Sequence, residues 1–208
     1  MTFGLPAKYR RNLTPVPFDD HAPVTGQCAG SEWQPDVYPH AADRAADLGR
    51  TTIIDVGCGA GRKLAPLADR FDVIGVDLPG IVDRIDLPGR WVAADFDTDG
   101  SLPVTGPALW VCSDVIEHLT HPDRLLRHLL DRIGEHGDHL IISTPDRDRS
   151  RWTRRNGPPL NRGHVQEWTL GELGAWLHAL GFTIEAQGHT RSNDHEPDLA
   201  TCLLEVTP

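Results

Sequence analysis

Short apolar runs alternate with amphipathic stretches along most of this sequence. Runs rich in β-branched and aliphatic residues predict seven strands, at residues 51–56, 71–76, 91–94, 108–112, 139–143, 182–186 and 201–206. Apolar residues at helical spacing predict helices at residues 35–48, 62–69, from Pro122 onward and from Thr169 onward. This alternation is typical of an α/β fold with a mostly parallel sheet.

Residues at the expected helix ends support this pattern. Pro122 suits a first helical turn, and an apolar stripe follows it. Thr169 and Glu172 have the spacing of a capping box, and Gly181 is placed to end the same helix. Gly49 is placed in the same way behind the first helix.

The pattern divides the chain into an arm and one domain. Residues 1–34 contain four prolines and little periodicity, which predicts an irregular arm that can act as a lid. Residues 35–208 are long enough to bury a single core, so we expect one domain there. Residues 145–164 read as a lid-like loop within that domain.

Charge and cysteine usage exclude several classes of protein. The formal net charge of −10 argues against long nucleic acid, which is bound largely through lysine and arginine. The sequence has no apolar run of membrane-spanning length and no signal-peptide pattern, so we expect a cytoplasmic protein without a membrane partner. The four cysteines are scattered and predict neither a zinc site nor a disulfide framework.

A glycine-rich loop follows the first predicted strand and carries the main chemical signal. Asp55 ends the strand, and Gly57, Gly59 and Gly61 follow at alternate positions. Such a turn lets backbone N–H groups line the floor beneath a nucleotide-like ligand, because a Cβ would block close approach. Arg62 stands where a dinucleotide fingerprint needs glycine, which weakens an NAD oxidoreductase reading.

Acidic residues end the next two strands and extend this candidate site. Asp77, followed by Leu78, is placed to accept hydrogen bonds from ribose hydroxyls. Asp95 is placed to take an adenine amino proton, with the ring of Phe96 packed on the purine. Ser113, at the end of the fourth strand, completes the expected cofactor-binding set.

These motifs, at residues 53–61, 73–77, 94–96 and 112–119, resemble those of class I S-adenosylmethionine-dependent methyltransferases. The resemblance implies a Rossmann-like seven-stranded sheet with helices on both faces and an antiparallel last strand, with Asp77 at the ribose and Asp95 near the adenine. Within the family, residues 113–119, 143–145 and 164–168 are most similar to the branch of ubiquinone-type, sugar and natural-product methyltransferases.

Asp114, Glu117 and His118 follow the fourth strand at spacings that place them on one helix face, and His164 can approach from a later loop. One hypothesis is that these four residues bind Mg²⁺ or another divalent metal that orients and acidifies an acceptor hydroxyl. A similar set occurs in metal-dependent small-RNA 2′-O-methyltransferases. The alternatives are a metal-free base at His118 or His164, catalysis by positioning alone, and a capping box made by Asp114 and Glu117.

Two segments are candidates for contact with the acceptor. Arg147, Arg151 and Trp152 lie in the lid-like loop, whose arginines can grip an anionic acceptor or form a solvated surface. Trp33 and Tyr38, together with the arm, can cover the cofactor or fill the edge of the sheet.

The sequence therefore predicts an S-adenosylmethionine-dependent methyltransferase that acts on a small molecule, with O-methylation of a sugar or natural-product intermediate as the leading hypothesis. The alternatives are N-methylation of a small molecule, metal-dependent 2′-O-methylation of short RNA, and a non-catalytic S-adenosylmethionine-binding domain. The oligomeric state has no signal in the sequence.

Overall fold

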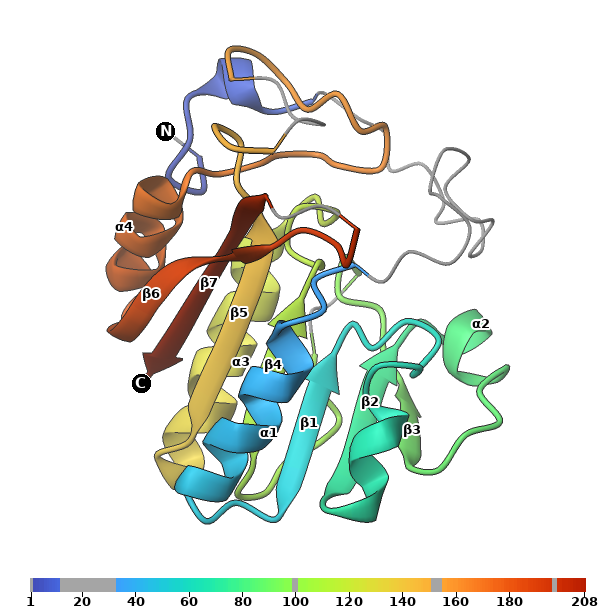
Figure 1. Ribbon diagram of the computed structural model, residues 1–208. Helices are drawn as coiled ribbons and strands as arrows, with labels where there is room; N and C mark the ends of the chain where they lie inside the picture. Colours follow the sequence, from blue (N-terminus) through green and yellow to red (C-terminus); the bar gives the residue numbers. More distant parts are fainter. Residues whose placement is uncertain (1, 12–32, 99–100, 151–154, 196–197) are drawn as a thin grey trace.

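The computed structural model describes residues 2–11, 33–98, 101–150, 155–195 and 198–208. A seven-stranded sheet in the order β3-β2-β1-β4-β5-β7-β6 forms its centre (Figure 1). Its strands are β1 (Thr52–Val56), β2 (Asp72–Asp77), β3 (Arg90–Ala93), β4 (Leu109–Ser113), β5 (His139–Pro145), β6 (Thr183–Arg191) and β7 (Leu199–Thr207). Strand β7 runs antiparallel to both of its neighbours, and the pairs from β3 to β5 are parallel. The predicted fold class is confirmed.

The helices are α1 (Val37–Asp47), α2 (Pro79–Val82), α3 (Pro122–His136) and α4 (Leu170–Leu180), with 3₁₀ turns η1 (Ala7–Tyr9) and η2 (Ala65–Asp69). The helix predicted at residues 62–69 is wrong, since only η2 forms there. A helix starting at residue 62 would need an N–H group at Pro66, which proline lacks. The sequence pattern did not reveal α2 or η1.

Alternating strand residues separate two hydrophobic layers. On one face, α1 and the segment before η2 pack over Ile53, Leu109 and Ile141. On the other face, α3 and α4 pack over Ile54 and Trp110. Both faces are therefore covered, as the long buried strands of a parallel sheet require.

Helix α4 begins and ends at the predicted signals. The Thr169 hydroxyl accepts the Glu172 N–H, and the Glu172 carboxylate accepts the Thr169 N–H, so the capping box is present. Gly181 ends the helix in the left-handed conformation, with φ of +112°.

The indole of Trp91 on β3 fills the space beneath the glycine loop. A Cβ added at Gly61 or Gly75 would come within 2.6 Å of this ring, and one at Gly89 within 3.1 Å. Real Cβ contacts of that length require the neighbour to move, so these glycines are needed for packing.

The described part of the predicted arm packs against the lid-like loop, and the two lie together beyond the carboxyl ends of the parallel strands (Figure 1). The Arg11 guanidinium donates to the Pro159 and Asn161 carbonyls of this loop, and just beyond the loop Arg10 forms an isolated bridge with Gln166. The indole N–H of Trp168 donates to the Phe3 carbonyl. Residues 12–32 of the arm lie outside the described residues. None of the described helices is long and apolar enough to cross a membrane.

Candidate active site

The glycine loop is fastened to the end of β2. The N–H groups of Gly57 and Cys58 donate to the Val76 carbonyl at 2.8 and 3.2 Å, and the Gly59 N–H donates to Oδ2 of Asp77 at 2.7 Å. These hydrogen bonds hold the loop against the neighbouring strand, and the expectation that the loop backbone lines the floor beneath a ligand stays a prediction. Asp77 also accepts the Leu78 N–H at 2.7 Å.

Two of the loop glycines have different surroundings. A Cβ at Gly57 would lie 2.2 Å from Cγ2 of Val115, which follows β4. A Cβ at Gly59 would have no described atom within 4 Å. The loop therefore packs against Val115 on one side and opens into free space at Gly59.

Beneath the loop, Tyr38 and Asp55 form a buried pair. The Tyr38 hydroxyl donates to Oδ2 of Asp55 at 2.8 Å, and Oδ1 of Asp55 has no hydrogen-bond partner among the described residues. Burial raises the pKa of Asp55 to about 7, which the Tyr38 hydrogen bond and the charge of Lys63 partly oppose. Tyr38 was expected to contact the acceptor, but its side chain is buried against Asp55 instead.

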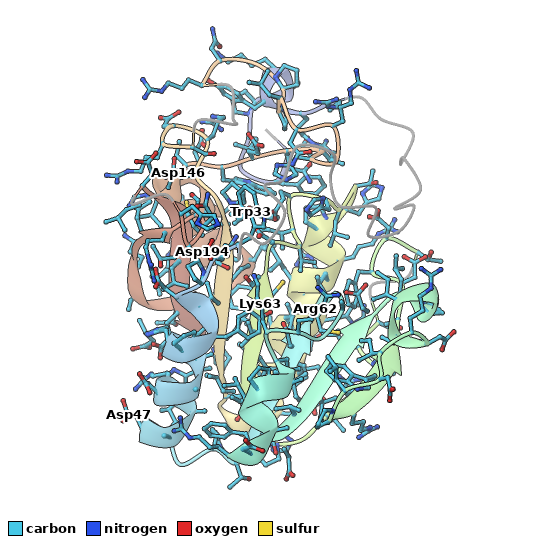
Figure 2. All side chains as sticks on the ribbon, turned by 45° about the vertical axis from the view of Figure 1, so that its right-hand side comes forward. Trp33, Asp47, Arg62, Lys63, Asp146 and Asp194 are labelled. Atoms are coloured by element: carbon cyan, nitrogen blue, oxygen red, sulfur yellow. The ribbon has the colours of Figure 1, made fainter. Side chains whose placement is uncertain are left out.

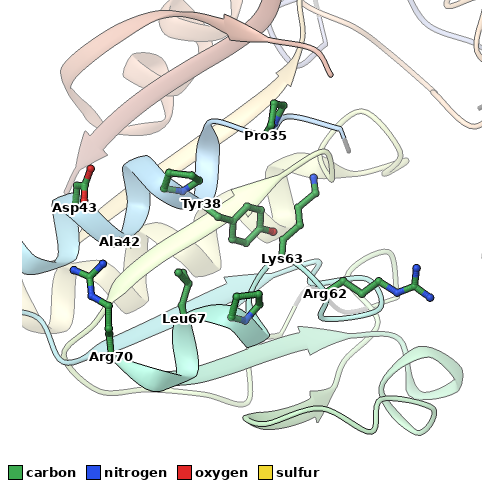
Figure 3. Close-up of a pocket in the computed structure, with 10 residues that line it drawn as sticks. Pro35, Tyr38, Ala42, Asp43, Arg62, Lys63, Leu67 and Arg70 are labelled. Atoms are coloured by element: carbon green, nitrogen blue, oxygen red, sulfur yellow. The ribbon is translucent and has the colours of Figure 1, made fainter. Parts of the chain in front are cut away.

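A shallow groove of about 420 Å³ separates α1 from residues 62–70 on the outer face (Figure 3). Tyr38 and Lys63 line it, and the Lys63 ammonium lies 5.6 Å from the centre of the Tyr38 ring. Lys63 also donates to the Trp33 carbonyl, so it ties the arm to the glycine loop (Figure 2).

The acids expected at the adenine end have local partners. Asp95 accepts the Asp97 and Thr98 N–H groups and the Thr98 hydroxyl, which closes a turn after β3. Phe96 is 6% exposed and belongs to the hydrophobic core, so the predicted stacking of its ring on a purine is wrong. Asp97, which the sequence did not single out, accepts the Thr120 N–H and connects this turn to the segment before α3.

Polar side chains meet where β4 and β5 end. Ser113 and Ser143, which are register partners, both donate to Oε1 of Gln34, and their Oγ atoms are 2.9 Å apart. The Gln34 amide N–H group donates to Oδ1 of Asp114. Gln34 is 1% exposed, and sequence reasoning missed it because no motif marks it.

Residues 114–119 form turns rather than the predicted helix face. Asp114 adopts a left-handed φ of +56°, which ends the strand and prevents a helix from starting there. Helix α3 starts at Pro122, after His121, without a side-chain cap. The capping box proposed for Asp114 and Glu117 is therefore wrong.

Glu117, His118 and His164 come together beneath the lid-like loop. One potential ligand atom from each lies within 4.8 Å of the others. Glu117 is fully buried, and neither of its carboxylate oxygens makes a hydrogen bond of normal geometry to a described residue. Burial, with the charge of Asp114, raises the pKa of Glu117. Asp114 is not part of this cluster.

The hydrogen bonds of the two histidines fix their tautomers. Nδ1 of His118 lies 2.9 Å from the Gly163 carbonyl, and Nδ1 of His164 lies 2.6 Å from the Glu167 carboxylate. Carbonyl and carboxylate oxygens only accept, so both Nδ1 atoms carry hydrogen. Nε2 of His164 accepts from the Asn161 amide at 2.9 Å and therefore carries a lone pair. Burial, aided by His164, lowers the pKa of His118 to about 3, so this ring is neutral near pH 7.

The structure separates the predicted acceptor contacts. Arg147 is 4% exposed, donates to Glu172 and to the Glu167 carbonyl, and lies 3.9 Å from the Tyr9 ring centre. The prediction that it binds an anionic acceptor is therefore wrong, because its guanidinium is paired with Glu172 inside the protein. Arg151 and Trp152 lie outside the described residues. Trp33 lies on the described end of the arm and bridges Asn193.

A second group of potential ligands lies at the base of the lid-like loop. Oδ2 of Asp146 accepts from Nε2 of His189 at 2.8 Å and from the Cys202 thiol at 3.4 Å. The same oxygen accepts the Leu170 N–H at the start of α4. These hydrogen bonds fasten the start of the loop to α4, β6 and β7.

Comparison with known proteins agrees with this arrangement. A family model described as a methyltransferase domain matches residues 31–187. The chain belongs to this methyltransferase family. It is an S-adenosylmethionine-dependent methyltransferase. No curated protein sequence matches it significantly.

Solved structures share the fold of this methyltransferase. An S-adenosylmethionine-dependent methyltransferase from Mesorhizobium loti is 21% identical, with a TM-score of 0.61 over 82% of this chain and 96% of the other. The O-methyltransferase NcsB1 from neocarzinostatin biosynthesis, bound to S-adenosylmethionine and 2-hydroxy-5-methyl naphthoic acid, is 20% identical, with a TM-score of 0.57 over 76% of this chain and 48% of the other. The [4+2]-cyclase SpnF is 16% identical, with a TM-score of 0.59 over 83% of this chain and 80% of the other.

The residues around the glycine loop fit S-adenosylmethionine. The open space at Gly59 leaves room for the ligand, and the Asp77 carboxylate stands beside it at the end of β2. The buried, unpaired Oδ1 of Asp55 offers a further acceptor below the loop. Both acids suit a ligand that carries hydroxyl, ammonium and sulfonium groups.

Proposed function

We propose that this methyltransferase methylates a hydroxyl oxygen of a small molecule, a sugar or natural-product intermediate. Glu117, His118 and His164 would hold a divalent metal ion, which would orient and acidify the acceptor hydroxyl. The observation that carries this proposal is the fully buried Glu117 carboxylate, which has no hydrogen bond of normal geometry to the described residues. Burial of this carboxyl group, with only the weak interactions that Asp114 and Thr144 provide, costs free energy, and a metal ion would offset that cost.

The two histidines have the arrangement that metal ligands need. Each presents an unprotonated Nε2, because Nδ1 donates to Gly163 or Glu167. A carboxylate or carbonyl behind a ligating imidazole is the usual outer contact in metal sites. Nε2 of His164 now accepts from Asn161 at 2.9 Å, and that amide would have to give way to the ion.

The donor set also indicates which ion binds. Two imidazoles and one carboxylate suit Mn²⁺, Co²⁺ or Zn²⁺ better than Mg²⁺, which prefers oxygen ligands. The bound ion would polarise the acceptor hydroxyl and lower its pKa. The acceptor oxygen then forms the new O–CH₃ bond as the S–CH₃ bond breaks, and the hydroxyl proton passes to solvent.

The rival mechanisms have weaker support. A metal-free base at His118 would work poorly near pH 7, because its pKa is about 3. Methylation of short RNA would use the same ligands, but the net charge of −10 opposes phosphate binding. The [4+2]-cyclase SpnF shares the fold, so the fold alone does not establish the reaction. Consumption of the cofactor without methyl transfer to any acceptor would favour a different reaction.

A screen of acceptor classes with methyl-labelled cofactor tests the proposal. Sugars, phenols, amines and short RNA are each incubated with enzyme that has been stripped with EDTA and then reloaded with Mn²⁺, Co²⁺, Zn²⁺ or Mg²⁺. We expect label on a hydroxyl oxygen, at a rate that falls at least tenfold after stripping and returns with a transition metal. Full activity after stripping would refute the role of the metal. Label on nitrogen only would refute methylation of oxygen.

Variants separate the metal from its alternatives. Glu117→Gln and His164→Ala should each lose bound metal, measured by elemental analysis, and lose activity in parallel. Glu167→Gln should weaken metal affinity by about 10- to 100-fold while keeping the ligands. His136→Ala changes an exposed histidine at the end of α3 and is the matched control. A normal metal content in the Glu117→Gln variant would contradict the proposed metal site.

A further inference from the structure

We propose that Asp146, His189 and Cys202 form a metal site for Zn²⁺ or a similar divalent ion, and that the ion fixes the start of the lid-like loop. The potential ligand atoms of these three side chains lie within 4.8 Å of one another. The site is distinct from the cluster around Glu117, whose ligands are a carboxylate and two imidazoles. Its role is to anchor the loop, so it is independent of the reaction proposed above.

The three residues come from neighbouring strands of the sheet. Asp146 directly follows β5, and its N–H donates to the Ala200 carbonyl on β7 at 2.9 Å. His189 on β6 and Cys202 on β7 are register partners, so their side chains lie beside each other on one face of the sheet. Paired strands hold side chains more precisely than loops do, and a metal site needs ligands that are held in place.

The distances between the ligand atoms are close to those of a tetrahedral site. Oδ2 of Asp146 lies 2.8 Å from Nε2 of His189 and 3.4 Å from Sγ of Cys202. A tetrahedral zinc ion with bonds of about 2.0–2.3 Å separates its ligand atoms by roughly 3.3–3.6 Å. The contact between Asp146 and His189 must therefore open by only about 0.5 Å to admit the ion.

The ligand types are those that zinc uses. Thiolate, imidazole and carboxylate all bind Zn²⁺, whereas Mg²⁺ and Ca²⁺ prefer oxygen ligands alone. The ion would replace the thiol proton of Cys202, which passes to solvent. It would also bind the lone pair of Nε2 of His189, with the ring hydrogen on Nδ1. The His189 side chain is 18% exposed, so a water molecule can reach the ion as its fourth ligand.

Hydrogen bonds alone satisfy this cluster poorly. Asp146 is 3% exposed and Cys202 is fully buried, and a thiol is only a weak hydrogen-bond donor. His189 adds a positive charge beside Asp146 only when its ring is protonated. A buried carboxylate is stabilised by a full opposite charge, which a divalent cation supplies.

The site lies at one end of the lid-like loop, and the cluster around Glu117 lies at the other. Asp146 is at the start of this loop and also accepts the Leu170 N–H at the start of α4. An ion at Asp146 would therefore fix the loop to α4, β6 and β7 together. The sequence did not reveal this group, because His189 and Cys202 lie 43 and 56 residues from Asp146.

Titration of the protein with Co²⁺ tests this site. A thiolate ligand gives bound Co²⁺ a near-ultraviolet charge-transfer band, which imidazole and carboxylate ligands do not give. Wild type and Glu117→Gln are stripped with EDTA, kept reduced and titrated. We expect one thiolate-bound ion per chain in both, and loss of the band when Zn²⁺ displaces Co²⁺.

Variants locate the thiolate. Cys202→Ser should abolish the band, and His189→Gln should weaken Co²⁺ binding by more than the roughly 10- to 100-fold that loss of an outer contact costs. Cys58→Ser is the matched control and should keep the band, because Cys58 lies outside the cluster and is the most exposed of the described thiols, at 8%. Elemental analysis of the zinc-loaded protein should show one ion fewer per chain in Cys202→Ser than in the wild type, and one fewer again when Glu117→Gln is added.

Each outcome decides a separate point. Absence of the band in the wild type overturns the proposal, and so does an unchanged band in Cys202→Ser or its loss in Cys58→Ser. In Glu117→Gln, Zn²⁺ should raise the melting temperature, and the addition of Cys202→Ser should remove that rise. A rise that persists would also overturn the proposal. An intact band, together with no labelled product from any acceptor, would refute the proposed function alone.

Discussion

Alanine at Gly57 should destabilise the protein much more than alanine at Gly59, although both glycines lie in one loop. Both have left-handed φ values, of +86° and +54°, so alanine costs each position about 1–2 kcal/mol in backbone strain. At Gly57 the new Cβ would also lie 2.2 Å from Cγ2 of Val115, whereas at Gly59 no described atom lies within 4 Å. The two variants therefore isolate the packing contribution.

The magnitude of that contribution follows from the geometry. Forcing an extra methyl group into a packed site costs about 1–3 kcal/mol. Gly57→Ala should therefore lose about 2–5 kcal/mol of unfolding free energy, and Gly59→Ala about 1–2 kcal/mol. In a Val115→Ala background the nearest contact at position 57 becomes Cβ of residue 115, at 3.3 Å. There, Gly57→Ala should cost no more than Gly59→Ala does in the wild type.

Urea unfolding of the cofactor-free protein, followed by tryptophan fluorescence, measures the unfolding free energies of the wild type, the three single variants and the double variant. Cofactor is omitted because alanine at either position can also obstruct the ligand. The reasoning is refuted if the two single variants lose equal stability, or if the Val115→Ala background does not relieve the loss at Gly57.

Three further predictions follow from buried polar groups. Burial raises the pKa of Asp55 from 3.8 to about 7, so the folded protein keeps a proton that the unfolded chain releases between these values. The contribution of Asp55 to the unfolding free energy should therefore fall by about 3–4 kcal/mol as pH rises from 4 to 7, and the difference between wild type and Asp55→Asn in urea titrations should show it; a difference that does not change with pH would refute it. Arg147→Met should lower the unfolding free energy by about 2–3 kcal/mol, because Glu172 loses its partner. The KM for the acceptor should stay unchanged, and a selective rise in that KM would show that Arg147 does bind the acceptor. Thr169→Ala should cost about 1 kcal/mol through the lost cap of α4, and a melting temperature equal to that of the wild type would argue against it.

The strands were predictable because their apolar runs are rich in β-branched and aliphatic residues and are separated by amphipathic stretches. The helix predicted at residues 62–69 was wrong, because the amphipathic pattern indicated a helix although Pro66 cannot donate one of its hydrogen bonds. The turn at Asp114 escaped prediction for a different reason. Aspartate is one of the few residues other than glycine that adopt a left-handed φ, but it is also common at helix starts, so the residue type alone does not distinguish the two.

The candidate site was predictable where its members are close in sequence or belong to a motif. Glu117 and His118 were grouped by their spacing on an expected helix, with His164 added from a later loop, and the structure places the three together although residues 114–119 form turns. Arg147 was misread because the partner that neutralises it, Glu172, lies 25 residues away. Gln34 could not be found, since its partners lie 79 to 109 residues away and a single glutamine carries no chemical signature.

The position of Trp91 has a consequence for how sequences of this fold can diverge. Its indole takes up the volume that side chains at Gly61, Gly75 and Gly89 would need. Each glycine also has a second restraint: a Cβ at Gly75 would lie 2.7 Å from Sγ of Cys58, one at Gly89 would lie 2.9 Å from Cγ2 of Val73, and Gly61 has a φ of +71°. A smaller residue at position 91 would therefore not make side chains acceptable at the three glycines, and Trp91 should diverge among relatives without matching changes there.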